Sequence, residues 1–157
     1  NNNHNIIIQN NNMNESEREA FMQEFETIRD KSLVAFCVLG GIFSEGIDLV
    51  NDKLIGAIIV GTGLPQTNFE SDMLLKHFDS TGKNGFDYAY RFPGMNKVCQ
   101  AAGRVIRTVD DRGVILLLDD RFNNFSYRKI FPKEWADYKL TNINKVEEDL
   151  REFWDSV

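Results

Sequence analysis

The stretch RGVILLLDDRF, residues 112–122, contains an unbroken run of aliphatic residues that ends on two aspartates. An apolar run without polar alternation is typical of a β-strand that is buried on both faces. Two earlier stretches, SLVAFCVLGG (32–41) and LIGAIIVGTGLP (54–65), have the same design, and each stops at glycines. We therefore expect three strands of a mainly parallel sheet, because such sheets are covered by helices on both faces.

Segments with helical periodicity lie between and around these strands. Residues 68–80 and 94–107 each read as a helix, and residues 141–157 close the chain as an amphipathic helix. Within residues 15–30, apolar side chains recur at the spacing of one helix face: Phe21, Met22, Phe25 and Ile28. The alternation of strands and helices predicts an α/β domain.

The composition is that of one globular domain with its own core, since the 157 residues are 42% hydrophobic and 27% charged. Near the start, Ile6, Ile7 and Ile8 favour a short buried strand. We expect residues 1–4 to be a disordered or expression-derived start. Residues 5–157 should form a single domain whose beginning is truncated.

The charge and the cysteines limit the function. A net charge of −6 argues against a broad basic surface for nucleic acid, so any DNA contact should be local. The sequence has no apolar run long enough for a membrane span and no secretory signal, so we expect a cytoplasmic protein without membrane contact. Cys37 and Cys99 lie in apolar surroundings, which predicts buried thiols rather than a disulfide or a metal site.

The stretch QAAGRVIR, residues 100–107, carries two arginines on the predicted helix 94–107. One face of this helix is apolar and consists of Val98, Ala101, Ala102 and Val105, whereas the opposite face holds Gln100, Arg104 and Arg107. Gly103 stands inside the helix, where glycine costs about 1 kcal/mol relative to alanine. Close approach of another backbone or of a ligand would explain that glycine. The alternative is an exposed helix with two solvated arginines.

The pattern Q-x-x-G-R-x-x-R of residues 100–107 resembles motif VI of superfamily 2 helicases, and GGIFSEGIDL (40–49) resembles their motif V. Together with the stretches YAYRFPGMNKV (88–98) and GVILLLDDRF (113–122), these motifs make the sequence similar to that of the DinG/XPD-like DNA helicases over about residues 5 to 135. This resemblance implies the second RecA-like domain, a three-layer fold with a mainly parallel sheet flanked by helices. It also implies that the first RecA-like domain is absent, because no Walker A loop is present.

The resemblance implies a role for each matched position in an ATP site that is shared with the first domain. Arg104 and Arg107 would contact the phosphates, with Arg107 as the arginine finger, and Gln100 would couple to the neighbouring domain. The nucleotide side of the site would also involve Glu45, Gly46, Asp48 and Gly103, of which Glu45 and Gly46 shape a turn and Asp48 contacts the ribose or the partner domain. The implied ligands and partners are ATP with Mg²⁺, single-stranded DNA and the first RecA-like domain, with no iron–sulfur cluster in this chain.

Two further patterns leave alternatives open. The end of the run LLLDD (116–120) could hold Mg²⁺, but a carboxylate that anchors Arg121 or Arg91 is favoured. The aromatic residues of the range 86–92 could stack on single-stranded bases, but packing in the core or between domains is favoured. A stand-alone nucleotide-binding module or an interaction domain is the alternative to a helicase half.

Overall fold

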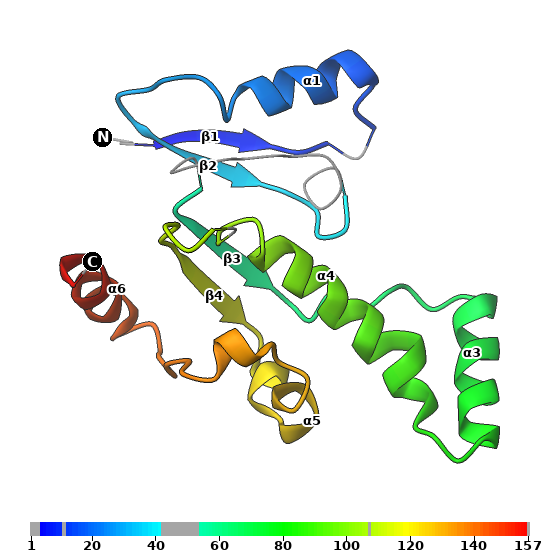
Figure 1. The fold of residues 1–157 in the computed structure, drawn as a ribbon. Helices are drawn as coiled ribbons and strands as arrows, with labels where there is room; N and C mark the ends of the chain where they lie inside the picture. The colour runs from blue at the N-terminus through cyan, green and yellow to red at the C-terminus, as the bar shows by residue number, and fades with distance from the viewer. Residues whose placement is uncertain (1–3, 11, 42–53, 107, 157) are drawn as a thin grey trace.

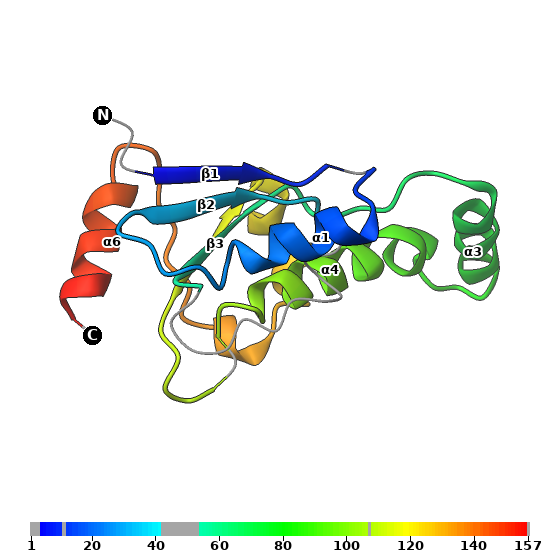
Figure 2. The ribbon, with the colours of Figure 1, turned by 90° about the horizontal axis from the view of Figure 1, so that it is seen from above.

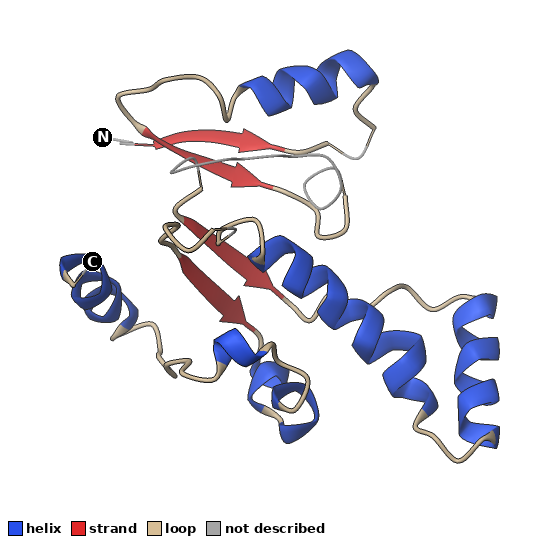
Figure 3. Ribbon diagram, viewed as in Figure 1, coloured by secondary structure: helices blue, strands red, loops and turns tan. Residues whose placement is uncertain are grey.

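The computed structural model describes residues 4–10, 12–41, 54–106 and 108–156. Its elements follow in the order β1 (His4–Ile8), α1 (Glu15–Gln23), β2 (Ser32–Phe36), β3 (Gly56–Val60), α3 (Phe69–Ser80), the π-helical η1 (Asp87–Arg91), α4 (Phe92–Ala102), β4 (Val114–Leu118), the 3-10 helix η2 (Asp120–Asn123), α5 (Phe125–Arg128), the 3-10 helix η3 (Lys133–Trp135) and α6 (Val146–Asp155). Helices alternate with parallel strands (Figures 1 and 3), which confirms the predicted α/β class.

The strands form two parallel pairs. β1 pairs with β2 in a register that runs from His4 opposite Ser32 to Ile8 opposite Phe36. β3 pairs with β4 in a register that begins with Gly56 opposite Val114. In the described part of the chain, β2 and β3 share no hydrogen-bonded ladder, although the two strands lie side by side in both views (Figures 1 and 2). The strands therefore form two short sheets with a gap between them.

Local side-chain hydrogen bonds set the start of two helices. Asn14 and Glu17 form a capping box at α1, because the Asn14 side chain accepts from the Glu17 N–H and the Glu17 carboxylate accepts from the Asn14 N–H. Asn68 caps α3 by accepting a 2.8 Å hydrogen bond from the N–H of Ser71. These caps satisfy backbone donors that have no partner inside the helix.

The core forms where α4 packs against β3. The predicted apolar side of α4 is buried, and Val98 is fully enclosed. The buried cluster consists of Ile59, Met95, Val98, Ala101, Ala102, Phe122 and Tyr127. Leu39, beyond the end of β2, packs against the same cluster, and α1 and α4 lie on the same side of the strands (Figure 2). One face of the sheet is thus well covered.

A pair of glycines permits the close contact between α4 and the loop after β3. Gly63 adopts a positive φ of 65°, which side-chain-bearing residues rarely adopt. A Cβ placed on Gly94 would lie 2.5 Å from the carbonyl oxygen of Thr62, so any larger residue would push the helix away. Backbone therefore meets backbone here, and this contact sets the distance between α4 and β3.

The strands are not buried on both faces as the sequence predicts. Along β1, β2 and β3 exposed and less exposed residues alternate. After the first residue of each strand, the exposed residues are aliphatic or aromatic: Ile6, Ile8, Val34, Phe36, Ile58 and Val60. The apolar runs contain enough hydrophobic residues for two covered faces. The described elements leave much of the second face open.

Two boundaries also differ from the expected ones. Ile28 is exposed because α1 ends at Gln23, so the residue no longer belongs to the helix face. β1 starts at His4, one residue before the expected boundary of the domain.

No helix among the described residues combines the length and the apolar composition that crossing a membrane requires.

We expect Met95→Ala to lower the free energy of unfolding by about 2–5 kcal/mol, because it opens a cavity in the cluster under α4. The matched control is Met73→Ala on α3, where the methionine is 54% exposed against 3% for Met95. Urea unfolding followed by circular dichroism measures both. Equal losses for the two variants would contradict the proposed position of the core.

Candidate functional site at the end of α4

The helix that carries the two-arginine pattern ends earlier than predicted. α4 stops at Ala102, and Gly103 is its C-cap, with its N–H donating to the carbonyl of Cys99 at 2.8 Å. Arg104 and Val105 follow in turns, because their N–H groups bond to the carbonyls three residues back. The prediction of one helix over 94–107 is therefore wrong beyond Ala102. Glycine is a poor residue for continuing a helix, which explains the stop.

Gly103 thus stands at a helix end and not inside a helix. The atom nearest to a Cβ added there would be the carbonyl oxygen of Cys99, in the preceding turn of α4, at 3.2 Å. Within the described residues no other segment approaches this glycine within 4 Å. The explanation by close approach of another part of the backbone is accordingly wrong for the described chain. Approach of a ligand stays a prediction.

The predicted separation of a polar and an apolar side is confirmed for those residues of 100–107 that the structure describes. Gln100 and Gly103 are exposed, Arg104 is half-buried, and Val105 is buried. Buried Val105 fixes the turn that follows the helix, so Arg104 projects from an anchored backbone. The end of α4 therefore presents polar groups next to the core.

The other predicted site residues lie outside the described residues. These are Arg107, together with Glu45, Gly46 and Asp48 of the motif V segment. Their roles stay predictions.

The start of the motif V segment nevertheless lies against α4. Gly40 has a φ of 86°, and a Cβ placed there would lie 3.2 Å from the Cδ atom of Lys97 on α4. Leu39 packs against the cluster under the same helix. Lys97 precedes Gln100 by about one helical turn. The structure therefore brings residues 39 and 40, at the start of the segment predicted as motif V, next to the helix that precedes the predicted motif VI.

Asp119, just after β4, anchors Arg121, as the sequence favours. Asp119 accepts two hydrogen bonds from the Arg121 guanidinium, at 2.9 and 2.7 Å, and its side chain also accepts from the Arg121 N–H. These bonds hold the pKa of Asp119 below its usual range. In residues 4–10, 12–41, 54–106 and 108–156, no three His, Cys, Asp or Glu side chains are grouped so that they could hold a metal ion.

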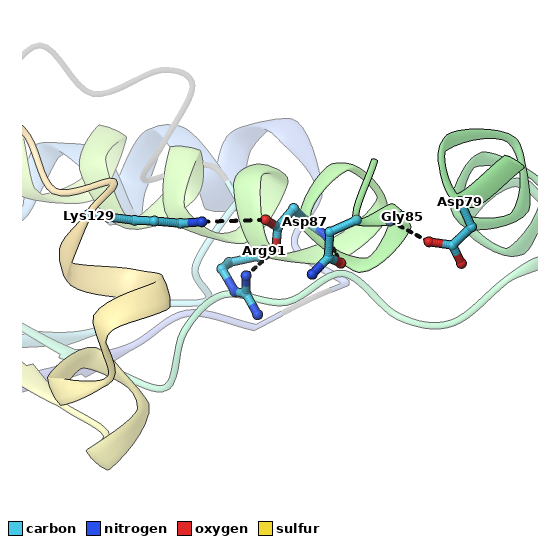
Figure 4. A network of polar contacts seen from close by, with 6 residues as sticks. Asp79, Gly85, Asp87, Arg91 and Lys129 are labelled. Carbon is cyan, nitrogen blue, oxygen red and sulfur yellow. Dashed lines mark hydrogen bonds and ion pairs between the residues drawn. The ribbon is translucent and has the colours of Figure 1, made fainter. Parts of the chain in front are cut away.

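Arg91 takes part in a different network, shown in Figure 4. Its guanidinium forms an ion pair with the buried Asp87 one turn earlier, and the Nζ of Lys129 lies 3.9 Å from the same carboxylate. The Arg91 guanidinium also lies over the rings of Phe86 and Tyr127, at 5.3 and 5.2 Å. This network ties η1 to the region of α5. This network is not among the expectations from the sequence, although the spacing of Asp87 and Arg91 is that of a helical ion pair.

The aromatic residues before Pro93 pack within the structure. Tyr88 stacks on Phe78 of α3, with ring centroids 3.8 Å apart. Tyr90 is buried, and its ring contacts that of Phe86 at 5.3 Å. These contacts join α3 to η1 and favour packing over base stacking for this segment.

Both cysteines are half-buried free thiols. Burial raises the pKa of Cys37 to about 11 and also raises the pKa of Cys99. The thiols stay protonated near neutral pH, which makes them poor nucleophiles.

Comparison with known proteins identifies the class. Residues 1–138 match the model of the helicase C-terminal domain, so the chain belongs to this family. The solved structures named XPD_APO and XPD_Helicase share the fold, with TM-scores of 0.59 and 0.54 at 21% and 19% identity. They are matched over 79% and 80% of this chain and over 25% and 26% of their own chains.

The curated relatives include two ATP-dependent DNA helicases and a helicase subunit of a transcription and DNA repair factor. The chain is 35% identical over 100 residues to ATP-dependent DNA helicase chl-1 of Caenorhabditis elegans, with 63% of this chain aligned. It is 37% identical over 91 residues to ATP-dependent DNA helicase DinG of Photobacterium profundum, with 57% aligned. It is 30% identical over 109 residues to the general transcription and DNA repair factor IIH helicase subunit XPD of Dictyostelium discoideum, with 66% aligned. The chain spans only 12% to 13% of the length of these three relatives.

We expect Asp87→Asn to lower the free energy of unfolding by about 3 kcal/mol, because it leaves the half-buried Arg91 without its counter-charge. Glu147→Gln is the matched control, since Glu147 and Arg151 form an ion pair of the same spacing that is largely exposed. This control should cost less than about 0.5 kcal/mol. Thermal unfolding compares the two variants, and similar losses would refute a structural role for the buried pair.

Proposed function

We propose that this chain is the C-terminal motor domain of an ATP-dependent DNA helicase and contributes motifs V and VI to an ATP site shared with a first RecA-like domain. The observation that supports the proposal is the proximity of Gly40 to Lys97 of α4, since a Cβ built on Gly40 would lie 3.2 Å from the Lys97 Cδ atom. We assign the segment that begins at Gly40 to motif V and the end of α4 to motif VI. Membership of the helicase C-terminal domain family supports it. In this arrangement, ATP is held at the seam between the two domains.

Two arginines of motif VI act on the phosphates of ATP. Charge spreads over the γ-phosphoryl oxygens in the transition state, and a guanidinium from across the seam stabilises it. We assign this arginine-finger role to Arg107 and phosphate binding to Arg104. Such a finger contributes roughly 10³ to 10⁵ in rate, which corresponds to about 4–7 kcal/mol. Lysine cannot replace either residue well, because it lacks the planar fork of the guanidinium.

The remaining site residues couple the two domains and bind the nucleotide. Gln100 is exposed on α4, one turn before Arg104, so its amide is available to the neighbouring domain. We assign contact with the ribose or with the partner domain to Asp48, and the shape of its turn to Glu45 and Gly46. Gly103 keeps the end of α4 free of a side chain where the nucleotide would pass.

Mg²⁺ accompanies ATP and neutralises charge on the β- and γ-phosphates. The described residues hold no cluster of acidic side chains for such an ion, and Asp119 is engaged with Arg121. We therefore assign the protein ligands of Mg²⁺ to the first RecA-like domain, and the arginines of this chain act on the phosphates alone.

The DNA contact of this domain is small. The chain carries a net charge of −6, whereas binding to many phosphates requires clustered lysine and arginine. A few phosphates held by backbone N–H groups in the motif V segment suffice for a motor domain that shares its track with another domain. Closing and opening of the seam over ATP then moves the helicase along single-stranded DNA.

DNA-stimulated ATPase activity of the full-length helicase tests the proposal. Arg107→Ala should lower kcat by at least a hundredfold, because it removes charge stabilisation in the transition state. Arg151→Ala is the control, since Arg151 is an exposed arginine on α6 that pairs with Glu147. It should leave kcat within about twofold of the wild type, because an exposed ion pair contributes little.

An Arg107→Ala enzyme with the activity of the Arg151→Ala control would remove Arg107 from the ATP site. Arg104→Ala distinguishes binding from chemistry, because loss of phosphate binding raises KM for ATP along with any change in kcat.

A further inference from the structure

We propose that Gln9 is a positioning residue for the segment assigned to motif V, because its side chain anchors the turn of residues 38–41 from which that segment continues. Gln9 directly follows β1 and precedes Val38 by 29 residues in the sequence. It is half-buried, and its side-chain amide lies against both ends of the turn. This role rests on the motif V assignment of the proposed function and adds a residue from outside both motifs.

Gln9 and the turn lie at the carboxyl ends of two paired strands. β1 and β2 are parallel, so both strands end at the same edge of the sheet (Figure 1). In open α/β sheets, ligands bind outside this edge. The N–H of Gln9 donates a 2.8 Å hydrogen bond to the carbonyl of Phe36, which continues the ladder one residue beyond Ile8. The backbone of Gln9 is therefore fixed where its side chain reaches the turn.

The Gln9 side chain takes the place of a backbone acceptor at the last step of this ladder. In a parallel pair, a residue that donates to one carbonyl of the partner strand accepts from the N–H two residues further along that strand. Here that N–H belongs to Val38, and it donates to the side-chain Oε1 of Gln9 at 3.0 Å. The N–H of Val38 thus keeps a partner while the main chain after Gln9 leaves the sheet.

The anchored turn is closed by its own hydrogen bond. The N–H of Gly41 donates to the carbonyl of Val38 at 3.0 Å, and Gly40, in the third position, has a φ of 86°. A positive φ at that position is characteristic of a type II turn. A Cβ built on Gly41 would lie 2.8 Å from the Nε2 atom of Gln9, so the amide fills the space beside this glycine. One side chain therefore lies against both Val38 and Gly41.

α4 gives the turn a second support. A Cβ built on Gly40 would lie 3.2 to 3.5 Å from the outer atoms of the Lys97 side chain. Leu39 packs against the buried cluster under α4. Loss of the Gln9 amide should therefore loosen the turn without unfolding the domain, because the packing of Leu39 remains.

The position of the turn matters for binding more than for chemistry. Under the proposed function, the motif V segment contacts ATP or the partner domain through Asp48 and contacts DNA through backbone N–H groups. A loosened turn has to be ordered again whenever these ligands bind, which weakens binding. The γ-phosphoryl charge is assigned to Arg107, on another segment. Gln9 should therefore affect KM for ATP and the DNA concentration that gives half-maximal stimulation, with little effect on kcat.

ATPase kinetics of the full-length helicase test this role with two substitutions of similar size. Gln9→Met removes the amide oxygen, so both KM for ATP and the half-maximal concentration of single-stranded DNA should rise about fivefold, as loss of one hydrogen bond predicts. kcat should stay within about twofold of the wild type. Gln9→Glu keeps an oxygen acceptor for the Val38 N–H and should preserve all three values. Gln23→Met is the control, because Gln23 is exposed at the end of α1.

Hydrogen exchange of the same full-length proteins reports on the turn without reference to ATP. Gln9→Met should speed exchange of the amides in residues 38–41 about fivefold, whereas Gln9→Glu and Gln23→Met should leave it unchanged. Unchanged exchange in Gln9→Met would overturn the anchor. Faster exchange with an unchanged KM and DNA dependence would overturn its positioning role.

A lower kcat with an unchanged KM would also overturn the positioning role, because it is the signature of a smaller folded fraction. The proposed ATP site fails on a different readout, the kcat of Arg107→Ala, so the two failures are distinguishable.

A second pair of substitutions tests the contact between Gln9 and the turn. Gly41→Ala places a methyl group against the Gln9 amide and should raise KM for ATP, because the turn has to shift. In the double variant with Gln9→Ala the methyl group has room, so the rise in KM should be smaller than the product of the two single effects. Effects that simply multiply would contradict the contact.

Discussion

The contact between α4 and the end of β3 is the constraint on which the rest of the structure depends. Gly94 lies so close to the carbonyl of Thr62 that no side chain fits between them. This contact holds α4 against β3, so that Val98 is fully enclosed and the loop after β2 meets the same helix. A helix held this closely has little freedom to tilt or slide. Groups at its far end are placed with corresponding accuracy.

The candidate site uses that accuracy. α4 ends at Gly103, and buried Val105 fixes the turn that follows. Arg104 lies between these two positions and is half-buried. An arginine that acts across a domain seam is most effective when its backbone does not have to reorganise. The ion pair between Asp87 and Arg91 has a matching role at the other end, where it ties the segment before α4 to the region of α5.

Much of the fold is predictable from the sequence, because apolar runs and helical periodicity are local signals. The runs at 32–41, 54–65 and 112–122 each contain a strand, and residues 68–80 contain a helix with Asn68 as its cap. Whether helices cover both faces of the sheet is not a local property of the sequence. An apolar run indicates that a strand has two hydrophobic faces, but it does not indicate that the described chain supplies the helices for both.

The site is predictable in part for the same reason. The side of α4 that holds Gln100 follows from helical periodicity. The end of α4 does not, because a glycine such as Gly103 can either end a helix or stand inside one where a ligand approaches the backbone. The buried network of Asp87 escapes a sequence reading, because an acid and an arginine four residues apart are usually an exposed pair. Their burial becomes apparent only when Tyr127 and Lys129 are brought next to them.

The central claim is that an arginine of this domain stabilises the charge that develops on the γ-phosphoryl group. The most direct measurement is the affinity of the full-length helicase, with single-stranded DNA, for ADP–aluminium fluoride and for ADP, in the wild type and in Arg107→Lys. A group that acts in the transition state should lower the affinity for ADP–aluminium fluoride by about a hundredfold or more when it is replaced, with little change for ADP. Equal losses for both ligands, or no loss for either, would contradict the claim.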